Sequence, residues 1–124
     1  MSKRSQSLGG RGEDAAARHL EAMGYTIRTR NYRKRFGEVD IVAEKDGVWI
    51  FVEVKTRSSD RCGTPAEAVD ARKQRKICAA ALSYISEYGK DGQGARFDVI
   101  EVYVGKGGLE IVHIPDAFLY EDPV

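Results

Sequence analysis

Two segments on either side of a tight-turn sequence constrain the fold of this chain most. Residues 38–43 and 48–56 are rich in β-branched and apolar side chains, as strands are. Between them, Lys45-Asp46-Gly47 has the composition of a short hairpin loop, because glycine accepts the positive φ that such loops need. The pattern predicts a β-hairpin in the middle of the chain, and the rest of the fold must be built around it.

Helical patterns lie on both sides of this hairpin. In residues 11–23, Ala16, Leu20 and Met23 recur at i, i+4 and i+7, and Gly24 follows as a stop. This spacing predicts an amphipathic helix.

A second, longer helix is predicted over residues 70–88. Large side chains recur there at helical spacing, namely Ile77, Ala81, Tyr84 and Tyr88. Its start has two candidate caps: Thr64-Pro65-Ala66-Glu67, which has the form of a capping box, and Asp70. Gly89 marks its end.

Three further segments have the pattern of strands, namely residues 25–30, 96–104 and a short one over 109–114. The predicted order is therefore helix, three strands, helix, and one or two strands. Short connections favour an antiparallel meander for the first three strands, and the long helix allows a right-handed crossover to a parallel fourth strand. The expected fold class is α/β, with a mixed sheet flanked by helices.

The length of the chain indicates one domain. Its 124 residues, 42% of them hydrophobic, are the usual size of a single domain and supply enough apolar bulk for one core. Residues 1–10, rich in Ser and Gly, are expected to form a flexible N-terminal segment, and residues 11–124 to fold as the domain.

Several kinds of protein are disfavoured. The longest apolar run, residues 48–52, is far shorter than the ~20 residues of a membrane span, and the N-terminus lacks the apolar stretch of a secretory signal. We therefore expect a cytoplasmic protein with no membrane partner, in which Cys62 and Cys78 form no disulfide. His19 and His113 have no second histidine or cysteine at ligand spacing, which argues against a zinc site.

Charge is distributed unevenly although the net charge is only +1. Residues 1–35 hold nine Lys or Arg against three acids, and residues 85–124 hold three against eight. The basic residues form two clusters, Arg28, Arg30, Arg33, Lys34 and Arg35, and Arg72, Lys73, Arg75 and Lys76 around Gln74. Such clusters can follow a phosphate backbone or can be ordinary solvated faces. Aromatic residues lie near the first cluster, namely Tyr25, Tyr32 and Phe36.

The predicted hairpin brings acidic side chains together. Alternation places Asp40 on one face of its strand with Glu38 and Val42, with Val39, Ile41 and Ala43 on the other, and gives Glu53 and Lys55 a common face. If the hairpin is symmetric about its turn, Asp40 lies nearly opposite Glu53. Facing carboxylates repel, so a divalent cation such as Mg²⁺ could offset their charge, with Lys55 orienting a water or stabilising charge on a phosphate. Alternatively, Lys55 only neutralises the two acids on an exposed sheet face.

These residues carry a resemblance. Asp40, followed after twelve residues by Glu53-Val54-Lys55, resembles the signature of the PD-(D/E)XK nuclease superfamily, whose core has the same order of elements. The resemblance extends from about residue 9 to residue 114 through four motifs, Gly12-Glu13-Asp14-Ala15-Ala16, Gly37-Glu38-Val39-Asp40-Ile41-Val42-Ala43, Phe51-Val52-Glu53-Val54-Lys55-Thr56-Arg57 and Arg96-Phe97-Asp98-Val99. As a set they are similar to the YraN-like family of small bacterial proteins, related to archaeal Holliday junction resolvases.

The resemblance implies a restriction endonuclease-like αβββαβ core and a role for each matching residue. Asp40 and Glu53 would bind Mg²⁺ or Mn²⁺ and Lys55 would be the catalytic lysine. The backbone carbonyl of Val54 would be a further ligand. Glu13 would match the acid that resolvase-like members carry on the first helix, reaching the metal directly or through water.

Nucleic-acid contacts follow from the same resemblance and from the basic clusters. Lys73 or Gln74 resembles an auxiliary polar position near the phosphate, and Arg33, Arg35 and Arg57 complete the predicted set. DNA is the expected partner, more than RNA, and a homodimer is compatible with cutting two strands symmetrically.

Other candidate residues have two interpretations each. Glu38 is a further ligand or pairs with nearby arginines, and Asp98 approaches the site or forms a salt bridge. Tyr32 could contact bases or sugar. Trp49 and Phe51, by contrast, follow a strand pattern that favours core packing.

Three functions remain open from the sequence. The leading one is a metal-dependent endodeoxyribonuclease acting on branched or repair intermediates. The alternative is a non-catalytic nucleic-acid-binding module that retains the nuclease fold. The third is a protein-interaction domain with no nucleic-acid partner.

Overall fold

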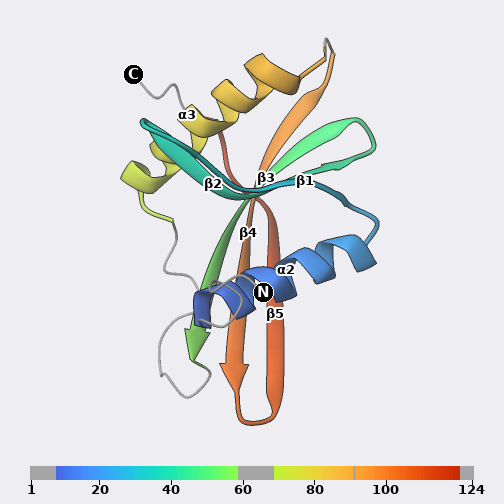
Figure 1. Cartoon of the computed structure of the whole chain (residues 1–124), viewed down its shortest axis with the longest axis vertical. Coiled ribbons are helices and arrows are strands. Elements are labelled where there is room, and N and C mark those ends of the chain that lie inside the picture. The colour runs from blue at the N-terminus through green and yellow to red at the C-terminus, as the bar shows by residue number, and fades with distance from the viewer. Residues whose placement is uncertain (1–7, 59–68, 91, 121–124) are drawn as a thin grey trace.

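The computed structural model describes residues 8–58, 69–90 and 92–120 of the chain. Over these residues it forms two helices and five strands (Figure 1). In chain order they are α2 (Leu8–Ala22), β1 (Thr26–Lys34), β2 (Gly37–Lys45), β3 (Val48–Ser58), α3 (Ala71–Tyr88), β4 (Gly94–Gly105) and β5 (Gly108–Phe118). The predicted αβββαβ order is confirmed, with a full fifth strand added.

All five strands form one mixed sheet in the order β1-β2-β3-β4-β5. The pairs β1–β2, β2–β3 and β4–β5 are antiparallel, and β3–β4 is parallel because α3 carries the chain back between them. The central hairpin closes at the pair Lys45 and Val48. Its two loop residues, Asp46 (φ 53°) and Gly47 (φ 76°), both have positive φ, as a tight two-residue hairpin loop requires.

The two helices cover opposite faces of the sheet (Figure 1). One core lies under α3, where Ile77 and Tyr84 pack on Trp49 and Phe51 of β3. The other lies under α2, where Leu20 packs among side chains such as Ile50. Trp49 and Phe51 are buried, so their predicted place in the core is confirmed.

The second helix starts at the nearer of its two candidate caps. The Asp70 carboxylate accepts a hydrogen bond from the Lys73 backbone N–H at 2.8 Å. At the other end, the Gly89 N–H donates to the Ile85 carbonyl. Residues 64–67 of the alternative capping box, and Cys62, lie outside the described residues. Cys78 is buried in the core under α3.

The first helix and the last strand are longer than predicted. α2 begins at Leu8, so residues 8–10 belong to the helix. β5 continues past Pro115 to Phe118, beyond the predicted end at residue 114. Proline is tolerated because β5 is an edge strand. The strand accommodates the interruption with a register shift, where Asp116 has φ 53°.

One predicted face was wrong. Val39 does not share a core with Ile41 and Ala43 but packs with Val42 under α3. The two-residue alternation breaks at Asp40, next to Asn31 of β1, whose φ of 56° departs from strand geometry. The side chain of Asp40 thus lies at a local irregularity of the sheet.

Within the described ranges, neither helix combines the length and apolar character needed to cross a membrane.

Candidate functional site

Asp40 and Glu53 face each other at the open end of the central hairpin. The β2–β3 pairing runs from Lys45 and Val48 to Ile41 and Val52. Just beyond its last pair, the side chains of Asp40 and Glu53 are joined by a hydrogen bond. The register predicted from the symmetric turn is therefore confirmed. Beyond Ile41, a side chain and not the backbone of β2 accepts the next hydrogen bond from β3. The Asp40 carboxylate accepts it from the Val54 N–H at 2.8 Å.

The two carboxyl groups interact electrostatically, and the interaction raises the pKa of Glu53. Glu53 is buried, with 7% of its surface exposed. Burial, the charge of Asp40 and a hydrogen bond to Asp40 raise the pKa of Glu53 to about 8, against the opposing charges of Lys73 and Lys55. The pair therefore holds a proton at neutral pH. Glu53 Oε2 is buried without a hydrogen-bond partner, and its oxygen is the type of ligand that Mg²⁺ and Mn²⁺ prefer.

Lys73 reaches the same carboxylates from α3. Its Nζ lies 3.1 Å from Glu38 Oε1 and 3.8 Å from Glu53 Oε2. Burial acts to lower the pKa of Lys73, but Glu53 and Glu38 outweigh it and raise that pKa, so the ammonium stays charged. Glu38 also pairs with Arg33 at 3.5 Å, which favours the ion-pair interpretation of Glu38 over the ligand one. The structure thus adds a lysine of α3 to the predicted acid pair.

Gly37 allows this lysine to come so close. A Cβ at Gly37 would overlap the Lys76 carbonyl oxygen, so α3 packs directly on the backbone where β2 begins. Gly12 has the same role for α2, because a Cβ there would overlap the Thr56 side chain of β3. Both glycines begin motifs that the sequence singled out, and the reason is close packing.

Lys55 continues the row of charged side chains along β3. Alternation places it on the face of Glu53, and its charge acts on the pKa of Glu53. In the parallel register its neighbour is Glu101 of β4, which is 1% exposed. Tyr103 donates a hydrogen bond to Glu101 at 3.3 Å, and Arg57 Nε lies 3.4 Å from it. Glu101 was not singled out from the sequence, although a charged residue inside the apolar run of β4 was a signal for it.

Glu13 lies apart from the acid pair. It is 2% exposed, and its Oε1 accepts hydrogen bonds from Arg30 and from Asn31, the residue beside Asp40 on the neighbouring strand. In the part of the chain that the structure describes, no three His, Cys, Asp or Glu side chains converge to hold a metal ion. Direct or water-mediated binding of a metal by Glu13, and by the Val54 carbonyl, stays a prediction.

Four of the predicted nucleic-acid contacts are engaged within the protein, among them Arg33, which pairs with Glu38. Arg57 pairs with Glu101, and Lys73 with the acids described above. Gln74 donates from Nε2 to the Val69 carbonyl at 2.8 Å and so supports the start of α3.

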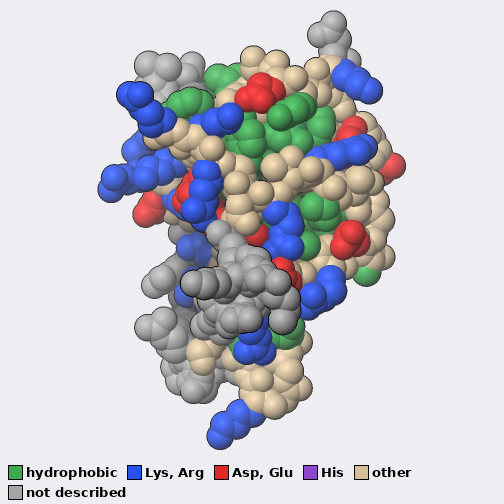
Figure 2. Space-filling view, viewed as in Figure 1, with side chains coloured by type: hydrophobic (Ala, Val, Ile, Leu, Met, Phe, Trp, Pro, Cys, Tyr) green, Lys and Arg blue, Asp and Glu red, His purple; other side chains and the backbone are tan. Residues whose placement is uncertain are grey.

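Arg33 and Arg35 are both exposed near the start of α3, where Figure 2 shows Lys and Arg side chains gathered on one side of the molecule. Exposed neighbours that the predicted contacts leave out lie beside them, namely Phe36, Arg72, Arg75 and Lys76. Tyr32, by contrast, is buried and hydrogen-bonded to Ser83 at 2.9 Å.

Asp98 belongs to a separate polar cluster and not to the acid pair. Arg96 donates two hydrogen bonds to it, both at 2.8 Å, which confirms the salt-bridge interpretation. His113 Nε2 lies 2.7 Å from its Oδ2, and the Asp116 N–H donates to its Oδ1. Burial acts to raise the pKa of Asp98, but these bonds lower it to about 2. Asp98 therefore ties β4 to β5 as a buried anion.

The two histidines meet beside this cluster, although they lie far apart in the sequence. The ring centroids of His19 and His113 are 5.5 Å apart, in an edge-to-face arrangement. Burial and the neighbouring His113 lower the pKa of His19. The contact joins α2 to β5.

Comparison with known proteins places the chain in a family. The model of "Uncharacterised protein family UPF0102" matches residues 12–102, which contain the acid pair, Lys55 and Lys73. A UPF0102 protein of Symbiobacterium thermophilum is 49% identical over 104 residues, covering 84% of this chain and 88% of that protein. Relatives in Myxococcus xanthus (49% over 114 residues, 91% and 90% covered) and Rhodococcus opacus (45% over 113 residues, 90% and 96% covered) are similar. The match spans most of each protein, and the chain belongs to the UPF0102 family, the YraN-like proteins that its motifs resemble.

Proposed function

We propose that this protein is a Mg²⁺- or Mn²⁺-dependent endodeoxyribonuclease of the PD-(D/E)XK type that hydrolyses phosphodiester bonds in branched or repair intermediates of DNA. The observation that carries the proposal is the contact of partly buried Asp40 with buried Glu53, with the pKa of Glu53 raised to about 8 and Lys55 on the same face. Two acids in this state gain from a cation that replaces the shared proton.

The residues of the chain fit such an ion. Asp40 and Glu53 supply carboxylate oxygens, and Glu53 Oε2 is buried and lacks a hydrogen-bond partner. As the resemblance implies, the Val54 carbonyl would add an uncharged oxygen, and Glu13 would add a more distant carboxylate. When bound, the ion would supply Lewis-acid stabilisation of the scissile phosphate and a more acidic water.

The lysines have separate tasks in this proposal. Lys55 orients the attacking water or stabilises the negative charge that develops on the phosphate. Lys73 holds Glu38 and Glu53 in place through its ion pairs and keeps the entrance to the site positive. The substrate must bring its own negative charge close to these ammonium groups, as a DNA backbone does.

Cleavage assays test the proposal directly. Purified protein is incubated with single-stranded, duplex, flapped and four-way-junction DNA in Mg²⁺, Mn²⁺ or EDTA. We expect metal-dependent cutting that Asp40→Asn, Glu53→Gln and Lys55→Ala each reduce by at least about 100-fold, as loss of a catalytic group usually does. Glu110→Gln and Lys106→Ala are matched controls, because both residues are exposed and remote from the acid pair in the sheet register. Wild-type cutting by Asp40→Asn and Glu53→Gln would refute this site.

A non-catalytic nucleic-acid-binding module is the second candidate, and the contact of Lys73 with Glu53 favours it. An ammonium group 3.8 Å from Glu53 Oε2 partly satisfies the pair without a metal. This alternative predicts DNA binding that weakens steeply with salt and no strand scission in any metal. Metal-dependent cutting by the wild type that Asp40→Asn removes would exclude it.

A further inference from the structure

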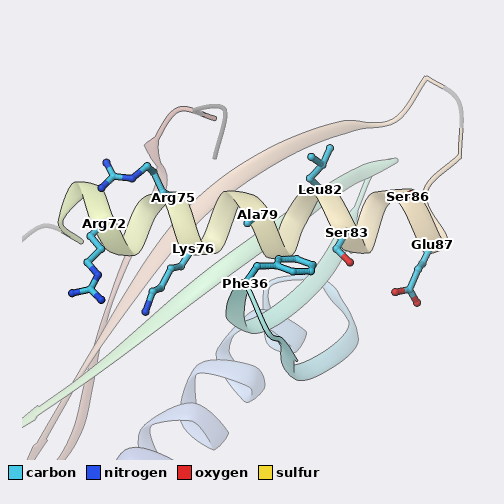
Figure 3. Close-up of a pocket in the computed structure, with 9 residues that line it drawn as sticks. All are labelled: Phe36, Arg72, Arg75, Lys76, Ala79, Leu82, Ser83, Ser86 and Glu87. Carbon is cyan, nitrogen blue, oxygen red and sulfur yellow. The ribbon is translucent and has the colours of Figure 1, made fainter. Parts of the chain in front are cut away.

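A groove of about 690 Å³ runs along the exposed side of α3, outside the acid pair (Figure 3). Its lining comes from α3 and from Phe36, which stands in the two-residue turn between β1 and β2. In Figure 3 the ring of Phe36 lies along the helix between Lys76 and Ser83, and Arg72 extends from the same side of α3. Arg75 and Leu82 project from the other side of the helix.

The two ends of the groove differ in charge. Arg72, Arg75 and Lys76 crowd the first turns of α3, and all three are exposed. They form no ion pair with any residue in the described ranges, whereas Lys73 between them is held by Glu38. Among the described residues of the lining, the only acid is Glu87 at the far end, where Lys34 pairs with it at 3.4 Å. At the near end, the described residues therefore leave three cations available to an anionic partner.

Apolar surface lies directly beside these cations. Phe36 is 56% exposed and Leu82 is 52% exposed, so both leave large apolar side chains in water. An exposed aromatic ring next to Lys and Arg side chains that form no ion pair with the described residues is the composition of a stacking platform for single strands. Duplex DNA keeps its base faces stacked, so only an unpaired base can lie on the ring.

The basic end of the groove is adjacent to the acid pair. Lys73 reaches Glu53 from the turn of α3 that also carries Arg72 and Lys76, and the charge of Lys76 acts on Glu38. A strand whose phosphates follow these cations therefore leads to the carboxylates.

We propose that the α3 groove binds a single-stranded segment of nucleic acid, with phosphates on Arg72, Arg75 and Lys76 and an unpaired base stacked on Phe36. The proposal rests on the proposed function and names its substrate class: nucleic acid with an unpaired strand next to the bond that is cut. An acidic protein segment would satisfy the cations but gains nothing from a ring that stacks bases.

Binding in EDTA tests the groove without any cleavage. Fluorescence anisotropy compares a labelled single-stranded oligonucleotide, the duplex of the same sequence, and poly-glutamate. We expect the wild type to prefer the single strand. Phe36→Ala should weaken single-strand binding about 10-fold and leave duplex binding unchanged, since stacking is lost. Phe36→Trp should restore the affinity, and its indole fluorescence should be quenched by the single strand.

The cations give a second, independent readout. Arg72→Ala, Arg75→Ala and Lys76→Ala should each weaken binding and lower the slope of log affinity against log salt by about 0.7. Lys106→Ala and Leu109→Ala are the controls, because both side chains are exposed at the β4–β5 turn and away from the groove. Single-strand binding by Phe36→Ala at the wild-type level, or equal binding of poly-glutamate, would overturn the proposal.

The proposal for the groove and the proposal for nuclease activity can be refuted independently of each other. Stacking-dependent binding in EDTA, together with no cutting in any metal, would support the groove and refute the nuclease. Metal-dependent cutting together with Phe36→Ala binding single strands normally would support the nuclease and refute the groove.

Discussion

Glu53 is a buried acid beside a second acid, an arrangement that costs free energy whenever both are ionised. The groups around Glu53 do not stabilise its charged form as well as the groups around a second buried acid, Asp98, stabilise that residue's charge. Asp98, equally buried, receives Arg96, His113 and a backbone N–H, and its pKa falls to about 2. Glu53 receives a distant ammonium at 3.8 Å, and its pKa rises to about 8. The fold therefore stabilises Asp98 as an anion, whereas it stabilises Glu53 in its protonated form.

The raised pKa of Glu53 predicts how stability changes with pH. Between the ordinary pKa of a Glu, near 4.5, and about 8, the folded protein holds a proton that the unfolded chain releases. The free energy of unfolding therefore falls as pH rises through this window. Glu53→Gln keeps the shape and removes the titration, so at pH 8 in EDTA it should be more stable than the wild type by about 1–3 kcal/mol.

Urea unfolding at several pH values measures this difference. The gap between Glu53→Gln and the wild type should shrink toward pH 5, where the folded wild type already carries the proton. Glu110→Gln is the control and should follow the wild type throughout. An equal gap at pH 5 and pH 8 would contradict the assignment of the raised pKa to Glu53.

At the scale of elements, the position of the acid pair depends on how closely α3 approaches β2. There is no room for a side chain at Gly37. A Cβ there would overlap the Lys76 carbonyl oxygen and come within 3.2 Å of the Ala80 nitrogen. Both neighbours are backbone atoms inside a helix, so α3 as a whole must shift to make room.

Gly37→Ala should therefore destabilise the protein by about 1–3 kcal/mol, as overpacking usually does. It should also move Lys73 away from Glu38 and Glu53, so DNA cutting should fall even where the protein is folded. Gly107→Ala is the matched control, because a Cβ at Gly107 meets nothing within 4 Å. Urea unfolding and the cleavage assay measure the two effects, and a Gly37→Ala variant as stable as Gly107→Ala would contradict the packing argument.

The sequence predicted those features that depend on residues close together in the chain, namely the hairpin turn and the ends of α3. Lys45-Asp46-Gly47 specified the hairpin loop, and with it the register that brings Asp40 close to Glu53. Asp70 and Gly89 marked the two ends of α3. Each of these signals acts between residues close in the sequence.

Contacts between distant elements had no such signal. The side of Val39 depends on an irregularity shared by two strands, and the extent of β5 depends on the bond from Asp116 to Asp98 of its neighbour. Lys73 was expected to meet phosphate, but its contact with Glu38 arises from the packing of α3 on β2. Similarly, Phe36 and Arg72 are 36 positions apart in the chain and share a groove only after folding.

Across the whole molecule, the net charge of +1 conceals a separation of charge between the first and last segments. Folding concentrates part of this charge where it can act. Exposed cations gather where α3 begins, beside the β1–β2 turn (Figure 2). Lys73 of the same helix turn contacts buried Glu53, which is hydrogen-bonded to Asp40. A polyanion attracted by the cations would repel the carboxylates unless a metal ion neutralised them, so the two regions are complementary only in the presence of a cation.

Metal binding should therefore be visible in the stability of the folded protein, with or without DNA. An ion that binds only the folded state stabilises it by about 2.7 kcal/mol at 100 times its Kd, or several degrees in Tm for a domain of this size. We expect Mn²⁺ and Mg²⁺ to raise Tm at pH 8, and EDTA to reverse the shift. The shift should shrink toward pH 6, because the ion competes with the proton on Glu53. Asp40→Asn and Glu53→Gln should remove it and Glu110→Gln should retain it. A shift that survives in Asp40→Asn would place the ion elsewhere and leave the acid pair without its proposed partner.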